Sequence, residues 1–159
     1  MSPAPMPAVI EDSLESLFAD ALAVVATDVP EAYARLGDEL GDIVLALHLG
    51  DERFALRHGQ TTPPQGEADA ELTTSATTLA QLVGGRIALT AALADRTITM
   101  LGAPRALAAV DRALRLLVHG IVRSPAAPDL MRRLEQLAHL ERVVSDADNT
   151  EHQQPKEPT

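Results

Sequence analysis

Five histidines are the side chains in this sequence most able to bind a metal or move a proton. His48 and His58 fall on opposite faces of a predicted hairpin, so they do not point toward a common ion. His119 falls in the last turn of a predicted helix, where a cation is favoured in any case. His139 and His152 have no partners at the spacing of metal ligands. The histidine pattern therefore predicts no metal site.

Hydroxyl side chains beside a pair of glycines are the second group that could carry chemistry. Gly84 and Gly85 follow a predicted helix and lack the spacing of phosphate-binding and dinucleotide-binding loops. No nucleophile stands beside a base, although serine, histidine and aspartate can converge from distant positions. The hydroxyl residues fit strand ends and helix caps: Thr73, Thr74, Ser75, Thr77 and Thr78. The sequence therefore predicts no catalytic residue, no cofactor and no enzyme activity.

Composition excludes further classes of function. The 159 residues suit one domain with a real core, and the absence of cysteine excludes disulfides and fits a cytoplasmic protein. No basic start with an apolar run marks a signal peptide, and no apolar run approaches the roughly 20 residues of a membrane span. A net charge of −10 and only three aromatic residues make nucleic acid an unsuitable partner. We expect a soluble, cytoplasmic protein.

The charge is unevenly distributed along the chain. Residues 1–50 hold nine acids and one base, whereas residues 101–145 hold four acids and seven arginines. Arginines on amphipathic helices usually form a solvated face, but this excess leaves transient contact with anionic membranes open.

The periodicity of apolar residues predicts two helices at the start of the domain. A helix begins near Asp12 or Ser13, where acids in the first turn suit the helix dipole. Pro30 suits the first turn of a second helix, which Gly37 can end.

Residues 42–58 form the firmest local prediction, a β-hairpin. Apolar residues alternate over 42–49, and Gly50-Asp51 suits a two-residue turn. That turn places Leu47 opposite Phe54 and Leu45 opposite Leu56, so the apolar side chains share one face. Turn geometry and hydrophobic pattern thus agree on one register.

The stretch 68–102 follows with a strand, a helix, a short helix and a strand. Alternation predicts the first strand over 68–73, and Thr74 or Ser75 caps a helix that stops at Gly84-Gly85. After a short helix or turn, Asp95-Arg96 leads into a strand over 97–101.

Two amphipathic helices close the domain. Pro104 begins the first, with Gly120 as its expected C-terminal cap, and Asp129 caps the second. We expect one domain over 12–144 that includes the C-terminal helix 129–144, with disordered ends at 1–11 and, as a polar acidic tail, at 145–159.

This order of elements resembles the type-2 sterol carrier protein family. The matching features are Ala68-Asp69 opening a strand, the helix before Gly84-Gly85, Ala92 in the next turn and the strand that ends at Gly102. The resemblance implies an α+β fold: a twisted mixed or antiparallel sheet of four to five strands, helices packed on one face, and extra N- and C-terminal helices. It implies a bacterial stand-alone member that binds lipids in a tunnel without catalysis.

The sequence departs from that family at three points. Arg96 stands where the family commonly has glycine, so we expect that turn to be rebuilt. Pro63-Pro64 leaves room for only a strand stub over 60–62. Aromatic residues, frequent in the family's tunnels, are nearly absent.

The predicted binding site is the apolar space between sheet and helices. We expect it to hold an apolar small molecule or lipid, such as a fatty acyl chain or sterol-like molecule. Arg86, beside the paired glycines, is the candidate partner for a polar end group. The residues predicted to line the site are Leu45, Leu47, Phe54, Leu56, Leu72, Leu82, Val83, Ile87, Leu89, Leu93, Ile98, Met100, Leu107, Val110 and Leu114.

Periodicity alone does not separate a hollow tunnel from a packed core. The alternative function is a protein-interaction or accessory module with a filled core, and a substrate-holding subunit of a separate enzyme also remains open. The C-terminal helix could pack on the domain, close the tunnel as a lid or dock a protein partner. We expect a monomer or weak dimer.

Overall fold

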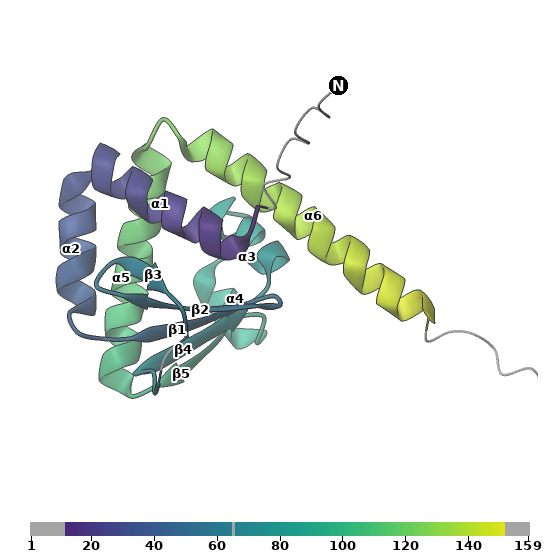
Figure 1. Ribbon diagram of the computed structural model, residues 1–159, viewed down its shortest axis with the longest axis horizontal. Coiled ribbons are helices and arrows are strands. Elements are labelled where there is room, and N and C mark those ends of the chain that lie inside the picture. The colour runs from purple at the N-terminus through teal and green to yellow at the C-terminus, as the bar shows by residue number, and fades with distance from the viewer. Residues whose placement is uncertain (1–11, 65, 152–159) are drawn as a thin grey trace, which may run out of the picture.

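The computed structural model describes residues 12–64 and 66–151, which form six helices and five strands (Figure 1). The expected disorder at 1–11 and 152–159, and His152, lie outside the described residues. The helices are α1 (Leu14–Asp28), α2 (Pro30–Leu40), α3 (Ala76–Val83), α4 (Leu89–Ala94), α5 (Pro104–Arg123) and α6 (Ala127–Glu151). The strands are β1 (Leu45–Leu49), β2 (Glu52–Arg57), β3 (Gln60–Thr62), β4 (Ala70–Thr74) and β5 (Thr99–Gly102).

The five strands form one mixed sheet in the order β3-β2-β1-β4-β5. This sheet, together with the helices, confirms the predicted α+β class. β1 runs parallel to β4, and the other neighbouring pairs are antiparallel. Leu47 pairs with Phe54 and Leu45 with Leu56, which confirms the predicted hairpin register. The ladder begins at Leu45, because Val44 instead bonds to Asp69 through both its N–H and its carbonyl. The predicted stub over 60–62 is β3.

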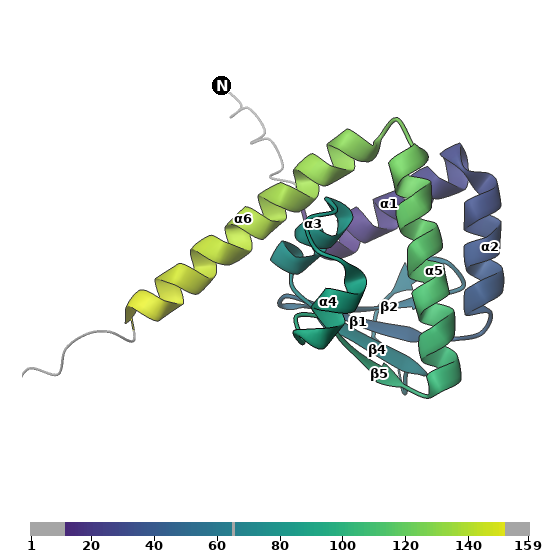
Figure 2. The same cartoon turned by 180° about the vertical axis from the view of Figure 1, so that it is seen from behind.

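The helices cover one face of the sheet, as predicted (Figures 1 and 2). Strands β1 and β4 show strict alternation, and every second residue is buried. Leu45, Leu47 and Leu72 lie on the buried face, each at most 5% exposed. Arg53 and Glu71 lie on the opposite face and are exposed. The alternation read from the sequence therefore marks the face on which the helices pack.

The ends of the first two helices differ slightly from expectation. Ser13 is the N-cap of α1, and its hydroxyl accepts a hydrogen bond from the Ser16 amide. α2 begins at Pro30 as predicted but continues through Gly37. It ends at Leu40 because Gly41 adopts a positive φ of 52°, a conformation that favours glycine.

Gly120 does not end α5, contrary to the prediction, because the helix continues to Arg123. A Cβ at Gly120 would lie 2.6 Å from the Val25 side chain of α1, well inside contact distance. Gly120 therefore permits α1 and α5 to approach closely rather than capping a helix.

The turn after α4 contains Arg96, the position where we expected the turn to be rebuilt. Arg96 adopts φ 59°, the left-handed conformation that glycine takes most easily. The turn closes α4, since the Thr97 amide donates to the Ala92 carbonyl at 3.0 Å. The backbone holds an arginine in a conformation suited to glycine.

Helix α6 begins two residues before Asp129 and extends seven residues past Val144, where we expected the helix to end. Beyond Glu141 its side chains are exposed, and backbone hydrogen bonds within the helix suffice to continue it. Both views show this end of α6 projecting away from the rest of the molecule (Figures 1 and 2). Within residues 12–64 and 66–151, every helix is too short or too polar to span a lipid bilayer.

Candidate functional site

A cavity of about 350 Å³ lies between the sheet and the covering helices. Its volume falls at the lower end of the roughly 300–1,000 Å³ range of small-molecule sites. All but three of its described lining residues are apolar, and the exceptions are Thr74, Arg115 and His119. The described wall of this cavity is therefore almost entirely apolar.

Strands β1 and β4 and the start of the β5 segment supply the sheet wall of the cavity. Leu47 and Leu49 come from β1, Leu72 and Thr74 from β4, and Ile98 precedes β5. Each of these residues is buried. The hydroxyl of Thr74 donates to the Thr97 carbonyl at 3.0 Å, so this polar group is already satisfied.

Helices α1, α5 and α6 supply most of the opposite, helical wall. Their buried contributions share the helical spacing of three and four residues. They are Leu14, Leu17 and Ala21 of α1, Leu117 and Ile121 of α5, and Leu130 and Leu134 of α6. Phe18 of α1 also lines the cavity and packs edge to face on Phe54, with ring centroids 5.8 Å apart.

The half-buried lining residues show where the cavity meets solvent. Apart from Phe18, which packs on Phe54, they belong on one side to α3, the segment after it and the start of α4, namely Leu79, Leu82, Val83, Ile87 and Leu89. On the other side they belong to α5 and α6, namely Leu114, Val118 and Met131. Arg115 and His119 are the exposed lining residues. The mouth therefore lies between α3–α4 and α5–α6, the helices that lie nearest the viewer in Figure 2 being α4 and α5.

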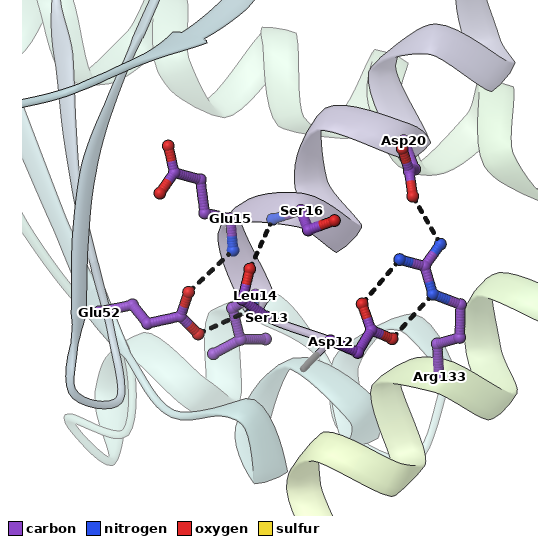
Figure 3. A network of polar contacts seen from close by, with 8 residues as sticks. All are labelled: Asp12, Ser13, Leu14, Glu15, Ser16, Asp20, Glu52 and Arg133. Atoms are coloured by element: carbon purple, nitrogen blue, oxygen red, sulfur yellow. Dashed lines mark hydrogen bonds and ion pairs between the residues drawn. The ribbon is translucent and has the colours of Figure 1, made fainter. Parts of the chain in front are cut away.

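Arg133 fixes α6 to the start of α1 (Figure 3). Its guanidinium donates two hydrogen bonds to the Asp12 carboxylate, at 2.9 and 2.8 Å, and one to Asp20 at 2.8 Å. The hydrogen bond from Arg133 holds the pKa of Asp12 below its usual value, and the two carboxylates raise the pKa of Arg133. This ion-pair network joins two elements of the helical wall.

Two further carboxylates accept hydrogen bonds at the starts of helices that lie far from them in the sequence. Glu141 of α6 accepts hydrogen bonds from the Ala76 amide at 2.8 Å and the Thr77 hydroxyl at 3.1 Å, at the start of α3. Glu52 of β2 accepts a hydrogen bond from the Leu14 amide at 2.7 Å, at the start of α1 (Figure 3). Negative charge is stabilising at these positions because free N–H groups and the helix dipole converge there.

Eight of the residues predicted to line the site lie on the cavity wall. They come from β1, β4, the residue before β5, α3, the residues around the start of α4, and α5. These eight are Leu47, Leu72, Leu82, Val83, Ile87, Leu89, Ile98 and Leu114. Contact of these residues with a ligand remains a proposal.

The other seven predicted residues lie away from the cavity. Leu45, Phe54, Leu56 and Val110 are buried in the packed core, and Leu93 is 38% exposed on α4. Met100 and Leu107 are half-buried and pack against the core. Part of the apolar face of the sheet therefore packs in the core, together with apolar residues of α5, rather than facing the cavity.

Sequence reasoning missed the contributions of α1 and α6 to the wall. Their apolar stripes were visible, but a stripe shows only that a helix face is buried, without showing against what. Pairing of Asp12 with Arg133, which sets α6 over α1, joins residues too far apart in the chain for spacing to reveal.

Arg86 does not lie at the cavity mouth, contrary to the expectation that it could meet a polar end group. It forms an ion pair with Glu135 at 3.2 Å and lines a separate polar pocket between α3 and α6. The cations at the apolar cavity are Arg115 and His119 of α5.

Groups suited to catalysis or metal binding are scattered. Among residues 12–64 and 66–151, no three His, Cys, Asp or Glu side chains lie close enough together to hold a metal ion. His48 lies on the open face of the sheet, 3.6 Å from Glu71. No buried side-chain nitrogen or oxygen in the described residues lacks a hydrogen-bond partner.

Comparison with known proteins finds similarity only at the level of solved structures. No family model and no curated protein matches the sequence. Sterol carrier protein 2 from Yarrowia lipolytica, in its apo form, is 18% identical with a TM-score of 0.47, covering 64% of this chain and 89% of its own. A hypothetical protein from Thermus thermophilus, described as a possible sterol carrier protein, is 22% identical with a TM-score of 0.44, covering 69% and 90%. Sterol carrier protein 2 like 2 from Aedes aegypti is 13% identical with a TM-score of 0.37, covering 54% and 95%.

Two of these solved structures are named sterol carrier proteins, and the third is named as a possible sterol carrier protein. At these identities and TM-scores the likeness establishes nothing about a ligand or an activity. The evidence on function is the cavity itself.

Proposed function

We propose that this protein is a non-enzymatic binding protein for an apolar small molecule, a lipid, fatty acyl chain or sterol-like molecule held between sheet and helices. The observation that carries the proposal is the cavity of about 350 Å³ whose described wall is apolar except for three residues. An apolar wall offers water few hydrogen bonds, and the lining lacks the packing contacts that an apolar ligand would supply.

The hydrophobic effect supplies enough free energy for such binding. Each methylene moved from water into the cavity contributes about 0.8 kcal/mol. A ten-carbon chain therefore gains several kcal/mol after the costs of association and ordering are subtracted. Leucine, alanine and methionine side chains in the wall adapt to varied shapes, which favours broad over narrow selectivity.

The lining residues favour binding over catalysis. Thr74 is the one hydroxyl residue on the described part of the wall, and its hydroxyl is committed to the Thr97 carbonyl. Arg115 and His119 lie at the mouth rather than facing a nucleophile. The described wall therefore lacks the pairing of nucleophile and base that covalent catalysis needs.

Titration of the delipidated protein with fatty acids and a sterol tests the proposal, by calorimetry or by displacement of a fluorescent probe. The cavity variant Ala21→Phe should lose at least tenfold in affinity, because the ring fills the space beside α1. Ala23→Phe is the matched control, since Ala23 is exposed on the same helix. Ala21→Leu serves if the larger side chain prevents folding. No saturable binding by the wild-type protein would sink the proposal, as would equal binding by both phenylalanine variants.

The alternative drawn from the sequence, a protein-interaction module with a filled core, fits less well because the space is open. The observation in its favour is the exposed apolar set Leu140, Val143 and Val144 of α6, each more than half exposed. Sedimentation of the delipidated protein separates the two functions. A protein that binds no apolar ligand but self-associates through these residues would support the module.

A further inference from the structure

The polar groups at the cavity are few and of one charge type. Of the three polar residues in the described lining, Thr74 is buried and already bonded to the Thr97 carbonyl. The two that remain, Arg115 and His119, are cationic or able to become so. A ligand whose apolar part fills the cavity would therefore meet these two side chains with its polar end.

Arg115 and His119 lie together on the rim. They are four residues apart on α5, so their side chains project from the same face, one turn apart. Both are exposed, and they lie beside the half-buried Leu114, Val118 and Met131, which mark the mouth. A polar group at the rim can reach them while the attached chain lies against Leu117 below.

Both side chains have donors to spare. The Arg115 Nε donates to the Asp111 carboxylate at 3.1 Å, and its terminal nitrogens form no hydrogen bond with a described residue. His119 likewise forms none with a described residue. Asp111 is absent from the cavity lining and offsets part of the charge of Arg115. Among the described residues, both rim side chains thus offer free N–H donors, while the Asp111 carboxylate is already engaged and His119 in its neutral form adds one acceptor nitrogen.

We propose that the cavity selects amphiphiles with an acidic end group, a carboxylate on an alkyl chain, and that Arg115 and His119 hold that group at the mouth. This inference rests on the proposed function and deepens it by naming the ligand class. A carboxylate accepts charge-assisted hydrogen bonds from Arg115 and is also attracted by its positive charge, an attraction that a neutral hydroxyl lacks. A cationic end group would be repelled by Arg115.

The surrounding charge agrees with this choice of ligand. The protein is acidic overall at −10, yet residues 101–145, which include all of α5, hold seven arginines and four acids. Of these seven arginines, Arg115 is the one in the described cavity lining, whereas Arg112 pairs with Glu39 at 2.6 Å and Arg133 with two aspartates. Arg115 is therefore a cation placed at the mouth, with donors left for a ligand.

Three ligands that share a ten-carbon chain and differ in end group test the proposal: decanoate, 1-decanol and decyltrimethylammonium. Each is titrated below its micelle concentration into the delipidated full-length protein. The wild-type protein should bind decanoate about tenfold more tightly than decanol, the effect expected of one hydrogen bond to a charged group. Decyltrimethylammonium should bind most weakly.

Substitutions then assign the preference to the rim. Arg115→Gln should lower decanoate affinity about tenfold and leave decanol unchanged, whereas Arg115→Lys should retain part of the preference. His119→Gln should lower decanoate affinity by a smaller factor than Arg115→Gln, because an imidazole provides fewer N–H donors than a guanidinium. Arg112→Gln is the matched control, one turn earlier on α5 and paired with Glu39. Thermal melts confirm that each variant folds.

The outcomes separate this inference from the proposed function. Equal affinity for decanoate and decanol, or equal effects of Arg115→Gln and Arg112→Gln, overturns the inference while binding itself stands. Absence of binding by all three ligands overturns the proposed function. If Arg115→Gln leaves decanoate binding intact but abolishes association with anionic phosphatidylglycerol vesicles, the rim contacts a membrane surface and the inference is wrong.

Discussion

The cavity has two walls that are held in different ways. Backbone ladders between neighbouring strands hold most of the sheet wall, including Leu47 and Leu72, and these side chains are almost completely buried. Side chains hold the helical wall, through the ion pairs of Arg133 and the caps formed by Glu52 and Glu141. Towards the mouth the helical wall becomes half exposed, at residues such as Leu82 and Met131.

This difference matters for a binding protein because a ligand needs a way in. The sheet wall provides a fixed surface, since moving it would break several hydrogen bonds at once. The helical wall can be adjusted one contact at a time, because each of its ties depends on a single side chain, Arg133, Glu52 or Glu141. Perturbing the sheet wall should therefore cost stability of the whole domain, and perturbing the helical wall should cost less.

The largest effect should come from shortening a side chain in the sheet wall. Leu47→Ala should lower the free energy of unfolding by about 2–4 kcal/mol, because Leu47 is 1% exposed and its loss enlarges the cavity. Leu82→Ala at the mouth should cost less than about 1.5 kcal/mol, since Leu82 is half-buried. Urea denaturation of both variants measures the difference. Equal losses would contradict the distinction between the two walls.

The close approach of α1 and α5 should give the next largest effect. Gly120→Ala places a methyl group 2.6 Å from Val25 and should destabilise by about 1–3 kcal/mol through overpacking. Gly37→Ala is the control within α2, where no atom lies within 4 Å of the added methyl group. That substitution should stabilise by about 0.5–1 kcal/mol. If thermal denaturation moves both variants in the same direction, the close contact does not set the spacing of the helices.

The Arg133 network should make a pH-dependent contribution to the free energy of unfolding. The folded-state pKa of Asp12 is lowered by the hydrogen bond from Arg133, so its contribution is present above its unfolded pKa of about 3.9. That contribution is lost as the pH falls through the lowered, folded-state value. Asp12→Asn should cost about 1–2 kcal/mol at pH 7, an estimate reduced for partial exposure.

The gap in stability between wild type and Asp12→Asn should shrink as the pH falls below about 4, measured by chemical denaturation at several pH values. Asp20→Asn is the comparison, since the Asp20 side chain is 54% exposed and should contribute less. A gap that stays constant down to a pH of about 2 would show that the carboxylate charge of Asp12 is not what ties α6 to α1.

The smallest effect should come from the turn after α4. Arg96→Gly should stabilise by about 0.5–1 kcal/mol, because glycine adopts φ 59° without the steric cost that an arginine meets. A rise in melting temperature of a few degrees would show it. A fall would mean that the arginine side chain makes a contact worth more than the backbone strain.

The sheet wall could be predicted from the sequence because local rules set it. Alternation indicated the faces of β1 and β4, and Gly50-Asp51 indicated the register of Leu47 on Phe54. These rules involve residues near each other in the chain. They placed Leu47, Leu72 and Ile98 on the correct side of the sheet, where the cavity lies.

The helical wall could not be predicted because distant pairs set it. Asp12 meets Arg133 across most of the chain, and Glu141 caps a helix that begins at Ala76. Gly120 was interpreted as a helix end because glycine is common there, but the side chain of Val25 explains the glycine. The partner for a polar end group was predicted at Arg86 because Arg86 adjoins Gly84-Gly85 in the sequence. Nearness in the sequence did not give its position in the fold.

A ligand-to-protein NOE experiment on the methyl-labelled protein, with bound decanoate, tests the central claim most directly. Contacts from the alkyl protons should reach methyl groups of both walls together, Leu47 and Leu72 of the sheet and Leu117 and Leu134 of the helices. Such contacts would place the chain in the cavity. Contacts confined to Leu140, Val143 and Val144 of α6, or no contacts at all, would contradict the account.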